Sequence, residues 1–285
     1  MLAAAAVLAL FATAAAGGGC PADCSLAGAC QPDGRCLCDA PFTGPSCQQL
    51  EQLPAAAVPA FVAPEGSTTW GGSAIQSDRN RSDFFMFASL SRNTTIVGYQ
   101  ASSVIVTTRS SSPAGPYSMV DPEAGPYTLG PRGGGFWDGA WLQNPVVTRL
   151  SKSRGFLLYY AAGSHSSHHW ATGDSSIGVA FATELTGPWL RPSAPVLQPL
   201  PAPHWEDGGI VNPAVFVDPA DDSILLGYRG TDDNGIAFAS APSWNGTYTR
   251  LFGGKRVFGE SVISYTSKTQ LGCAHMLFFL GEAYD

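Results

Sequence analysis

The sequence is poor in charged residues. Only 13% of its 285 residues are Asp, Glu, Lys or Arg, and the formal net charge is −7. It contains no cluster of Lys and Arg. Because binding to the phosphates of nucleic acids needs such clusters, we expect no nucleic-acid partner. The apolar share is 45%, which is too high for a disordered chain and sufficient for a folded core.

Long apolar runs are also missing, except at the N-terminus. The stretch from Leu2 to Thr13 is apolar and is followed by the small residues Ala14-Ala15-Ala16. It is short for a membrane span of about 20 residues, and its small residues suit cleavage by signal peptidase. No Lys or Arg precedes it, and an uncleaved N-terminal anchor is the alternative. We expect residues 1–16 to be a signal peptide, and the secreted protein to have no membrane span.

If the protein is secreted, three Asn-X-Ser/Thr sequences become candidate glycosylation sites. N-linked glycans attach to this sequence pattern in secreted proteins, which makes a glycoprotein the expectation. The three asparagines are Asn80, Asn93 and Asn245.

Six of the seven cysteines fall within the segment from Cys20 to Cys47. A segment of fewer than about 30 residues cannot bury a useful core, so disulfides must stabilise it. It has no C-x2-C pair of the kind that binds zinc, and we expect no metal there. Six cysteines permit fifteen pairings, among which the spacing alone does not choose. The seventh, Cys273, has no partner in this interpretation.

The cysteine spacing, with Gly28-Ala29-Cys30 and the run from Phe42 to Cys47 ("FTGPSC"), resembles an EGF-like domain of the tenascin type. The resemblance implies a domain over residues 17–48, followed by a linker over residues 49–66. The calcium-binding subtype has an acidic cluster before its first cysteine, where this chain has three glycines, so we expect no calcium and no other cofactor. The resemblance also implies the disulfides Cys20–Cys30, Cys24–Cys36 and Cys38–Cys47.

The rest of the chain contains a repeat. "NPVVTRLSKSRGFLLYYAAG" begins at Asn144 and "NPAVFVDPADDSILLGYRG" at Asn212, and a similar pattern without Asn-Pro begins at Gly71. Each has an apolar strand, a polar turn and a second strand, and is followed by a third strand and by a turn leading to a short fourth. Four short strands per 60 to 70 residues are typical of a propeller blade. A sandwich is the competing fold, but it does not explain three copies of one strand order.

The repeat, with its small-residue third strands and its "GPY" or "GPW" turns, resembles the five-bladed β-propeller of glycoside hydrolase family 43 and its relatives. The resemblance runs from about Trp70 to Glu260. It implies an all-β chain whose residues 67–285 form an incomplete propeller of three to four blades. A ring with missing blades would expose apolar faces, so the sequence looks truncated.

The resemblance also implies positions for catalytic carboxylates, because glycoside hydrolysis needs two of them flanking the bond. In the family an Asp opens the first blade, where this chain has Gly71 and Gly72. A second Asp corresponds to Asn212, and the second blade also begins with an amide, Asn144. Glu260 lies near the expected fourth-blade acid, within a poorly matching motif. Since an amide cannot act as a general base, binding without turnover is favoured.

The two Asn-Pro pairs have two possible roles. As leading residues of their blades they would face the central channel and contact a ligand. Alternatively, each Asn would cap a turn before its strand, with Pro restricted to the edge. The repeat favours the channel for Asn212, whereas for Asn144 the turn is at least as well supported.

Tryptophan and acid pairs precede the second and third repeats. Aromatic faces stack on sugar rings and carboxylates accept their hydroxyl groups, so these pairs suit a carbohydrate site. Packing of the tryptophans between blades explains them equally well. If the protein is catalytic, Asp138 and Glu206 are the candidate acids together with Glu260. The substrate-binding candidates are Trp137, Trp141, Asn144, Trp205, Asp207 and Asn212.

A histidine-rich loop, with His165, His168 and His169, could hold a metal, but without regular spacing we interpret it as a polar loop. The sequence thus predicts a secreted protein that binds a glycan or glycoprotein without turnover. One alternative is a hydrolase of extracellular polysaccharide with relocated carboxylates. The other is a structural protein that interacts through its EGF-like module.

Overall fold

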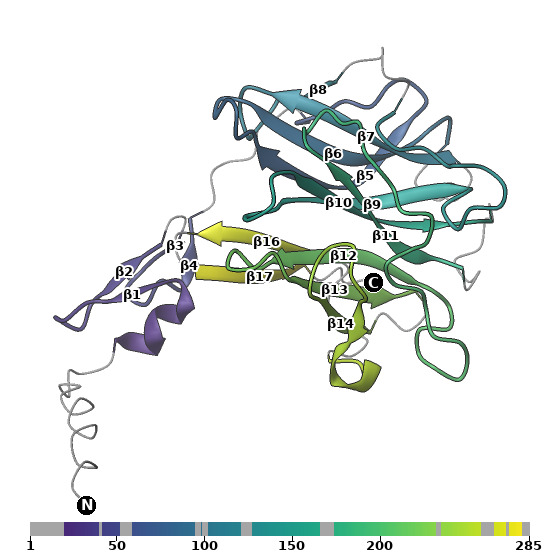
Figure 1. Cartoon of the computed structure of the whole chain (residues 1–285). Coiled ribbons are helices and arrows are strands. Elements are labelled where there is room, and N and C mark those ends of the chain that lie inside the picture. The colour runs from purple at the N-terminus through teal and green to yellow at the C-terminus, as the bar shows by residue number, and fades with distance from the viewer. Residues whose placement is uncertain are drawn as a thin grey trace, which may run out of the picture. The chain divides into compact units, whose positions relative to one another are not determined.

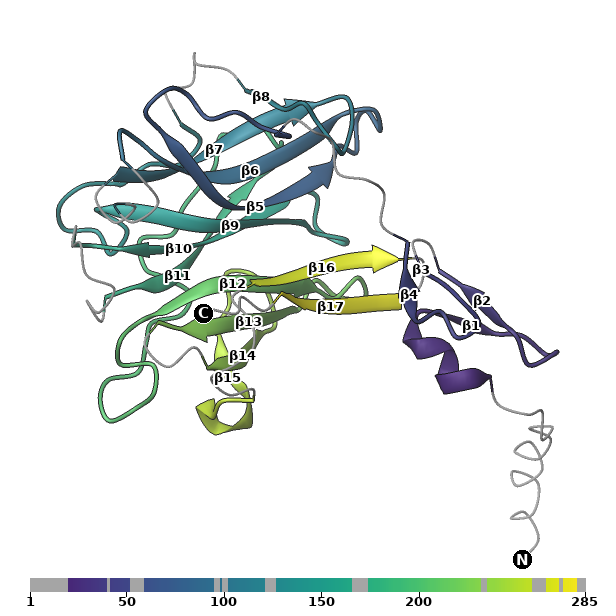
Figure 2. The same ribbon diagram turned by 180° about the vertical axis from the view of Figure 1, so that it is seen from behind.

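The computed structural model describes residues 20–39, 42–51, 59–94, 98, 102–120, 127–165, 174–231 and 235–257, and the backbone of residues 265–271 and 274–280. Contacts divide the chain into two compact units (Figures 1 and 2). The first comprises Met1–Ala55 with Thr269–Met276, and the second comprises Ala56–Lys268 with Leu277–Asp285. The predicted signal peptide lies outside the described residues.

The N-terminal unit is built from a short helical turn and two small antiparallel hairpins. Strand β1 pairs with β2, and β3 pairs with β4. The elements are η1 (Pro21–Leu26), β1 (Gly28–Cys30), β2 (Cys36–Cys38), β3 (Phe42–Thr43) and β4 (Gln49–Leu50).

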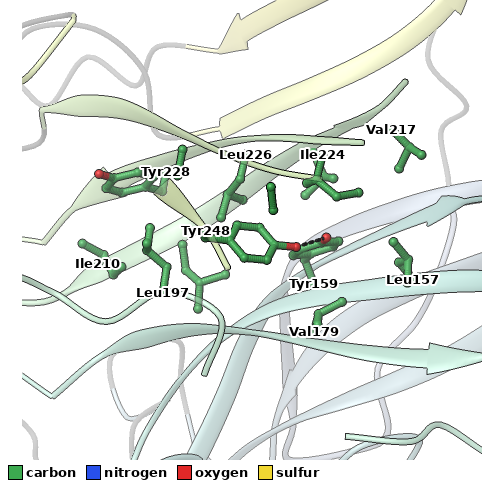
Figure 3. Packing of buried hydrophobic residues seen from close by; sticks show 14 of the residues in the cluster. Leu157, Tyr159, Val179, Leu197, Ile210, Val217, Ile224, Leu226, Tyr228 and Tyr248 are labelled. Carbon is green, nitrogen blue, oxygen red and sulfur yellow. Dashed lines mark hydrogen bonds between the residues drawn. The ribbon is translucent and has the colours of Figure 1, made fainter. Parts of the chain in front are cut away.

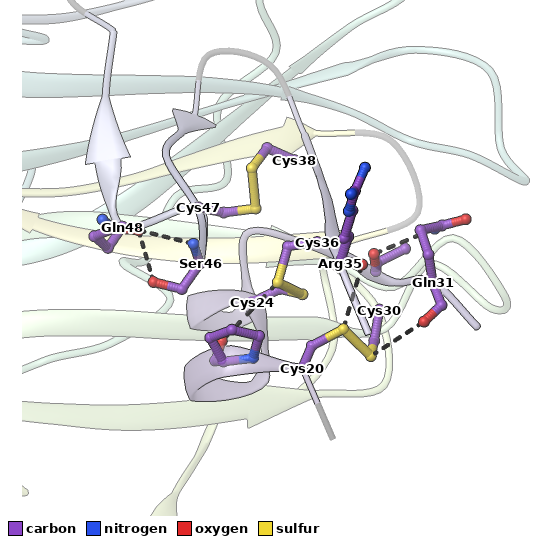
Figure 4. Close-up of a disulfide and its surroundings, with 12 residues drawn as sticks. Cys20, Cys24, Cys30, Gln31, Arg35, Cys36, Cys38, Ser46, Cys47 and Gln48 are labelled. Carbon is purple, nitrogen blue, oxygen red and sulfur yellow. Dashed lines mark hydrogen bonds between the residues drawn. A yellow bond between two sulfur atoms is a disulfide. The ribbon is translucent and has the colours of Figure 1, made fainter. Parts of the chain in front are cut away.

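Three disulfides take the place of a hydrophobic core in this unit (Figure 4). Cys24 and Cys47 are fully buried, and Ala27 is the only other apolar residue buried with the cysteines in this part of the described chain. With so little apolar surface to bury, covalent closure must supply much of the stability. The bonds are the three that the EGF-like resemblance implied: Cys20–Cys30, Cys24–Cys36 and Cys38–Cys47.

The second unit consists of antiparallel sheets that follow one another along the chain (Figure 1). We call them blades. Blade 1 contains β5 (Thr68–Gln76), β6 (Phe84–Ser91), β7 (Ser103–Ser110) and β8 (Ser118–Met119). Blade 2 contains β9 (Trp141–Arg149), β10 (Phe156–Gly163) and β11 (Ser176–Ala182). Blade 3 contains β12 (Ile210–Val217), β13 (Ile224–Gly230), β14 (Ile236–Ala241) and β15 (Thr249–Arg250).

The predicted repeat of strand order is confirmed. Blades 1 and 3 each have four strands paired in sequence order, and in blade 2 the fourth strand is reduced to a single bridge between Phe181 and Leu190. After blade 3 come a short turn, η4 (Leu251–Gly254), and a separate two-stranded sheet of β16 (Tyr265–Leu271) and β17 (Ala274–Leu280). The described chain is therefore all-β apart from short turns, as expected.

Both faces of strand β10 are buried, because a neighbouring blade packs against each of them. Its side chains alternate between the two faces, as strand geometry requires. Leu158 and Tyr160 pack toward blade 1, against residues such as Phe87. Leu157 and Tyr159 pack toward blade 3 (Figure 3).

Most of the core lies between neighbouring blades. The cluster between blades 2 and 3 includes Leu226, Tyr228 and Tyr248, and the hydroxyl groups of Tyr159 and Tyr248 lie 2.6 Å apart (Figure 3). This hydrogen bond satisfies two buried polar groups within an apolar cluster. Face-to-face packing of successive sheets is what a propeller requires. No helix within the described part of the chain is both long and apolar enough to cross a membrane.

Candidate functional site

The first strands of the three blades lie side by side. β9 contacts β5 on one side and β12 on the other. Each of these strands contains a β-bulge, at Gly71, Asn144 and Asn212, and each of the three residues has a positive φ, of 50°, 51° and 53° respectively. The first strands of all three blades therefore have a β-bulge with a positive φ at the equivalent position.

The bulge explains why an Asn-Pro pair occurs within a strand. Asn tolerates the left-handed conformation better than other residues that have a side chain, and Gly tolerates it without strain. Pro has no N–H to donate, so it fits at a bulge where the ladder is interrupted. Both pairs lie inside their strands rather than at the head. Asn144 is the fourth residue of β9, and Asn212 is the third of β12.

The bulges bring three residues together, which we call the axial residues: Gly71, Asn144 and Asn212. The Nδ2 of Asn144 donates a hydrogen bond to Oδ1 of Asn212, between neighbouring blades. A Cβ atom on Gly71 would lie 2.6 Å from Oδ1 of Asn144, so glycine is needed for this approach. The backbone N–H of Asn144 is held by the Ser89 hydroxyl at 2.9 Å.

The axial residues can form hydrogen bonds, but none of them has a carboxyl group. Asn144 and Asn212 are 7% and 8% exposed. Oδ1 of Asn144 has no hydrogen-bond partner among the described residues, although it is buried. A buried acceptor without a partner is costly, and a donor brought by a bound molecule would satisfy it.

Asp138, a predicted catalytic residue, is completely buried in blade 2. Its Oδ1 accepts a hydrogen bond from Arg132 at 2.6 Å. Its Oδ2 accepts hydrogen bonds from Arg191 and from the Tyr160 hydroxyl, both at 3.1 Å. Burial, and then the charge of Asp138, raise the pKa of Tyr160, so this tyrosine stays a hydrogen-bond donor.

Glu206 has the same position in blade 3 and is also completely buried. The Tyr228 hydroxyl donates to Oε1 at 2.7 Å, and the Nη2 of Arg250 donates to Oε2 at 2.5 Å. The backbone N–H of Leu200 donates to Oε2 at 3.1 Å. Burial, and then the hydrogen bond to Glu206, raise the pKa of Tyr228.

We call each acid with its Tyr and its Arg partners a clamp. In each clamp the acid lies in the segment before the first strand, the Tyr lies on the second strand, and an Arg lies in or beside the fourth strand. The clamp therefore ties these three parts of the blade together. All the oxygens of both acids have partners, so a substrate would have to displace an arginine to reach them. A structural role is therefore sufficient to explain why both acids are buried and paired. The catalytic roles of Asp138 and Glu206 stay predictions.

The tryptophans before the repeats pack against the clamps. Trp137 stacks on Tyr160 with ring centroids 5.7 Å apart, and Trp205 stacks on Tyr228 at 6.2 Å. Both keep partial exposure, whereas Trp141 is 1% exposed. One face of each stacked ring is thus occupied, and the sugar-stacking role of these tryptophans stays a prediction.

The remaining candidates lie apart from the axial residues or outside the described residues. Asp207 is exposed beside the buried Glu206. The Nδ1 of His165 lies 2.9 Å from Oδ2 of Asp174, and the same oxygen accepts hydrogen bonds from the backbone N–H groups of Ser164 and His165. Outside the described residues lie Glu260, His168, His169 and Cys273. The three predicted glycosylation sites, Asn80, Asn93 and Asn245, are all exposed.

Sequence reasoning missed the partners of the acids. Tyr160 and Tyr228 carried a usable signal, because their spacing equals that of Asn144 and Asn212. The arginines carried a weaker signal. Arg191 and Arg250 each lie four residues after the turn glycine that precedes the fourth strand, but the preceding loops differ in length, so the two arginines do not show the 68-residue spacing.

Comparison with known proteins supports the fold. No protein-family model and no curated protein sequence matches the chain. Solved structures do match. One is a family 117 glycoside hydrolase of the marine bacterium Zobellia galactanivorans, with a TM-score of 0.53, 14% identity and coverage of 71% of this chain and 60% of that one. A thermostable family-43 glycoside hydrolase matches with a TM-score of 0.53, 18% identity and coverage of 76% and 66%.

A third structure, described as a glycoside hydrolase, has a TM-score of 0.53, 13% identity and coverage of 74% of this chain and 64% of that one. The chain therefore spans about 60% to 66% of the length of these enzymes. At such identities the likeness concerns the fold. The second unit has a glycoside-hydrolase-like β-propeller fold.

Proposed function

We propose that the protein binds a carbohydrate unit of an extracellular glycan or glycoprotein at the axial residues, without hydrolysing it. One observation carries this proposal. The leading strands of three blades meet through two amides and a glycine, with no carboxylate among them. Hydrolysis of a glycosidic bond needs two carboxyl groups beside it, whereas amides only donate and accept hydrogen bonds.

The unpartnered Oδ1 of Asn144 supports the same proposal. Sugar hydroxyl groups are donors as well as acceptors, and one of them would satisfy this oxygen. The proposal includes secretion through the N-terminal signal peptide, with an EGF-like module at the front of the mature chain. The three disulfides support it, because disulfides persist in oxidising compartments.

The test is a glycan array probed with the full-length secreted chain, followed by incubation of each bound glycan with the protein. We expect binding to at least one glycan, and no release of reducing sugar. Release of sugar would contradict the proposal. A chain that binds no glycan would overturn it in favour of interactions through the N-terminal unit.

A glycoside hydrolase is the second candidate, and the propeller fold shared with such enzymes is the observation that favours it. It would use relocated carboxylates, with Asp138 and Glu206 as candidates. Hydrolysis that is lost in both Asp138→Asn and Glu206→Gln, while each variant stays folded, would establish it. These changes keep the size and shape of each side chain, but they remove its charge and replace one acceptor oxygen with an NH2 donor.

A further inference from the structure

A hollow lies between blades 1 and 2, at the turn ends of their strands and away from the axial residues. Its volume is about 460 Å³. That is within the range of about 300 to 1,000 Å³ usual for small-molecule sites. It is formed by the β5–β6 turn, the β9–β10 turn and the turn that follows β11.

The floor of the hollow is apolar. Phe85, Leu150, Phe156 and Leu185 line it, and each is less than a tenth exposed. Phe85, Phe156 and Leu185 belong to the core cluster between blades 1 and 2, and Leu150 belongs to the cluster between blades 2 and 3. The floor is therefore held in place independently of any ligand. Such a surface suits the apolar face of a ring.

The rim of the hollow is charged, and two of its arginines are already paired. Arg79 forms an ion pair with Glu184 across the two blades. Arg109 pairs with Asp83 within blade 1, with 2.6 Å between nitrogen and oxygen. These pairs fix the rim and present polar atoms to hydroxyl groups.

Arg154 differs from the other rim arginines. It lines the hollow from the exposed β9–β10 turn, and no carboxylate among the described residues pairs with it. Because a guanidinium binds carboxylates and similar oxyanions through paired N–H groups, Arg154 supplies a place for one negative charge.

We propose that this hollow is a second ligand site, which binds an acidic sugar ring with its apolar face on the floor and its carboxylate on Arg154. The class of ligand is a uronate, free or as a residue of a polysaccharide. The site uses none of the axial residues, so it does not depend on the proposed binding there.

The test is an NMR titration of the full-length protein at an ionic strength of about 0.15 M, where charges beyond about 8 Å are screened. The probes are glucuronate and galacturonate, with glucose, galactose and inorganic sulfate for comparison. We expect at least one uronate to bind at least about fivefold more tightly than its neutral parent and than sulfate. Equal binding of the neutral sugars would overturn the role of Arg154, and equal binding of sulfate would overturn the role of the floor.

Three variants locate the site. In Arg154→Gln we expect uronate affinity to fall at least about fivefold, because the ligand's charge loses its partner. In Glu184→Gln we expect it to rise, because Arg79 is released from its ion pair. Arg81→Gln is the matched control, since Arg81 lies in the β5–β6 turn but is not among the residues that line the hollow. Unchanged affinity in Arg154→Gln, or an equal loss in Arg81→Gln, would overturn the proposal, and thermal melting verifies that each variant is folded.

Discussion

Blade 1 differs from blades 2 and 3 at each position that makes a clamp. In blades 2 and 3 an acid lies six residues before the bulge, as Asp138 and Glu206. At the same distance before Gly71 is Glu65, which is exposed. The tyrosine opposite the bulge in blades 2 and 3 is Ala88 in blade 1.

The arginine is missing from blade 1 as well. Arg191 and Arg250 each lie four residues after the glycine of the fourth-strand turn, and in blade 1 that position is Met119. Tyr, Arg and a buried acid are thus present together or absent together. This is the pattern of a structural network, because a buried acid without its arginine would be strongly destabilising. The comparison therefore favours a structural role for the acids in blades 2 and 3, while their catalytic roles stay predictions.

The largest effect is expected from breaking a clamp. Asp138→Ala leaves Arg132 and Arg191 without their buried partner, and we expect it to lower the free energy of unfolding by about 3–5 kcal/mol. The measurement is urea denaturation followed by tryptophan fluorescence. Glu65→Ala is the matched control and should change stability by no more than about 0.5 kcal/mol. A similar small change for both variants would contradict the structural role of Asp138.

The next effect concerns the bulge at which blade 1 has Gly71 in place of Asn. Gly71→Ala puts a side chain at a φ of 50° and 2.6 Å from Oδ1 of Asn144. We expect a loss of about 2 kcal/mol from backbone strain and crowding together. In the control Gly134→Ala nothing lies within 4 Å of the new Cβ, and thermal melting should show little change. Equal melting temperatures for the two variants would refute the close approach at the axial residues.

The smallest effect concerns the hairpin turns, which also differ between blades. Asp222 of the blade 3 turn accepts backbone N–H groups of Ser151, Lys152 and Ser153 in the blade 2 turn, at 2.6 to 3.1 Å. The blade 1 turn makes an exposed ion pair instead, between Asp78 and Arg149.

Burial acts to raise the pKa of Asp222, but the three N–H donors outweigh it, and the pKa is lowered. Its stabilising contribution is therefore present above the ordinary Asp pKa of about 3.9, and is lost as the pH falls through the lowered value. We expect Asp222→Asn to reduce stability at neutral pH and to flatten its fall in acid, as measured by denaturation between pH 2 and 7. Asp78→Asn should leave the profile nearly unchanged, and a profile unaltered by Asp222→Asn would contradict this assignment.

The fold could be predicted to a large extent from the sequence. The order of strands follows from period-two alternation and from turn residues, both of which are local properties. The 68-residue spacing between Asn144 and Asn212 indicated that they occupy equivalent positions in two blades. The hydrogen bond between their side chains agrees with this. Their positive φ was less accessible, because Asn-Pro at a turn and Asn-Pro at a bulge have the same sequence.

The buried ion pairs of the acids could not be predicted from the sequence, because they depend on long-range partners. Arg191 is 53 residues from Asp138, and Arg250 is 44 residues from Glu206. An acid beside a tryptophan suits a sugar site as well as a buried ion pair, and only the packing distinguishes them. The hollow at the turn ends was missed for the same reason, since three separate turns form it.

The most direct test of the central claim is the affinity of the protein for a glycan that it binds on the array, compared between the natural chain and Asn144→Gly. Glycine keeps the left-handed backbone and removes only the amide. We expect the variant to melt within a few degrees of the natural chain, and its affinity for that glycan to fall about tenfold or more. Undiminished affinity in the folded variant would contradict glycan binding at the axial residues.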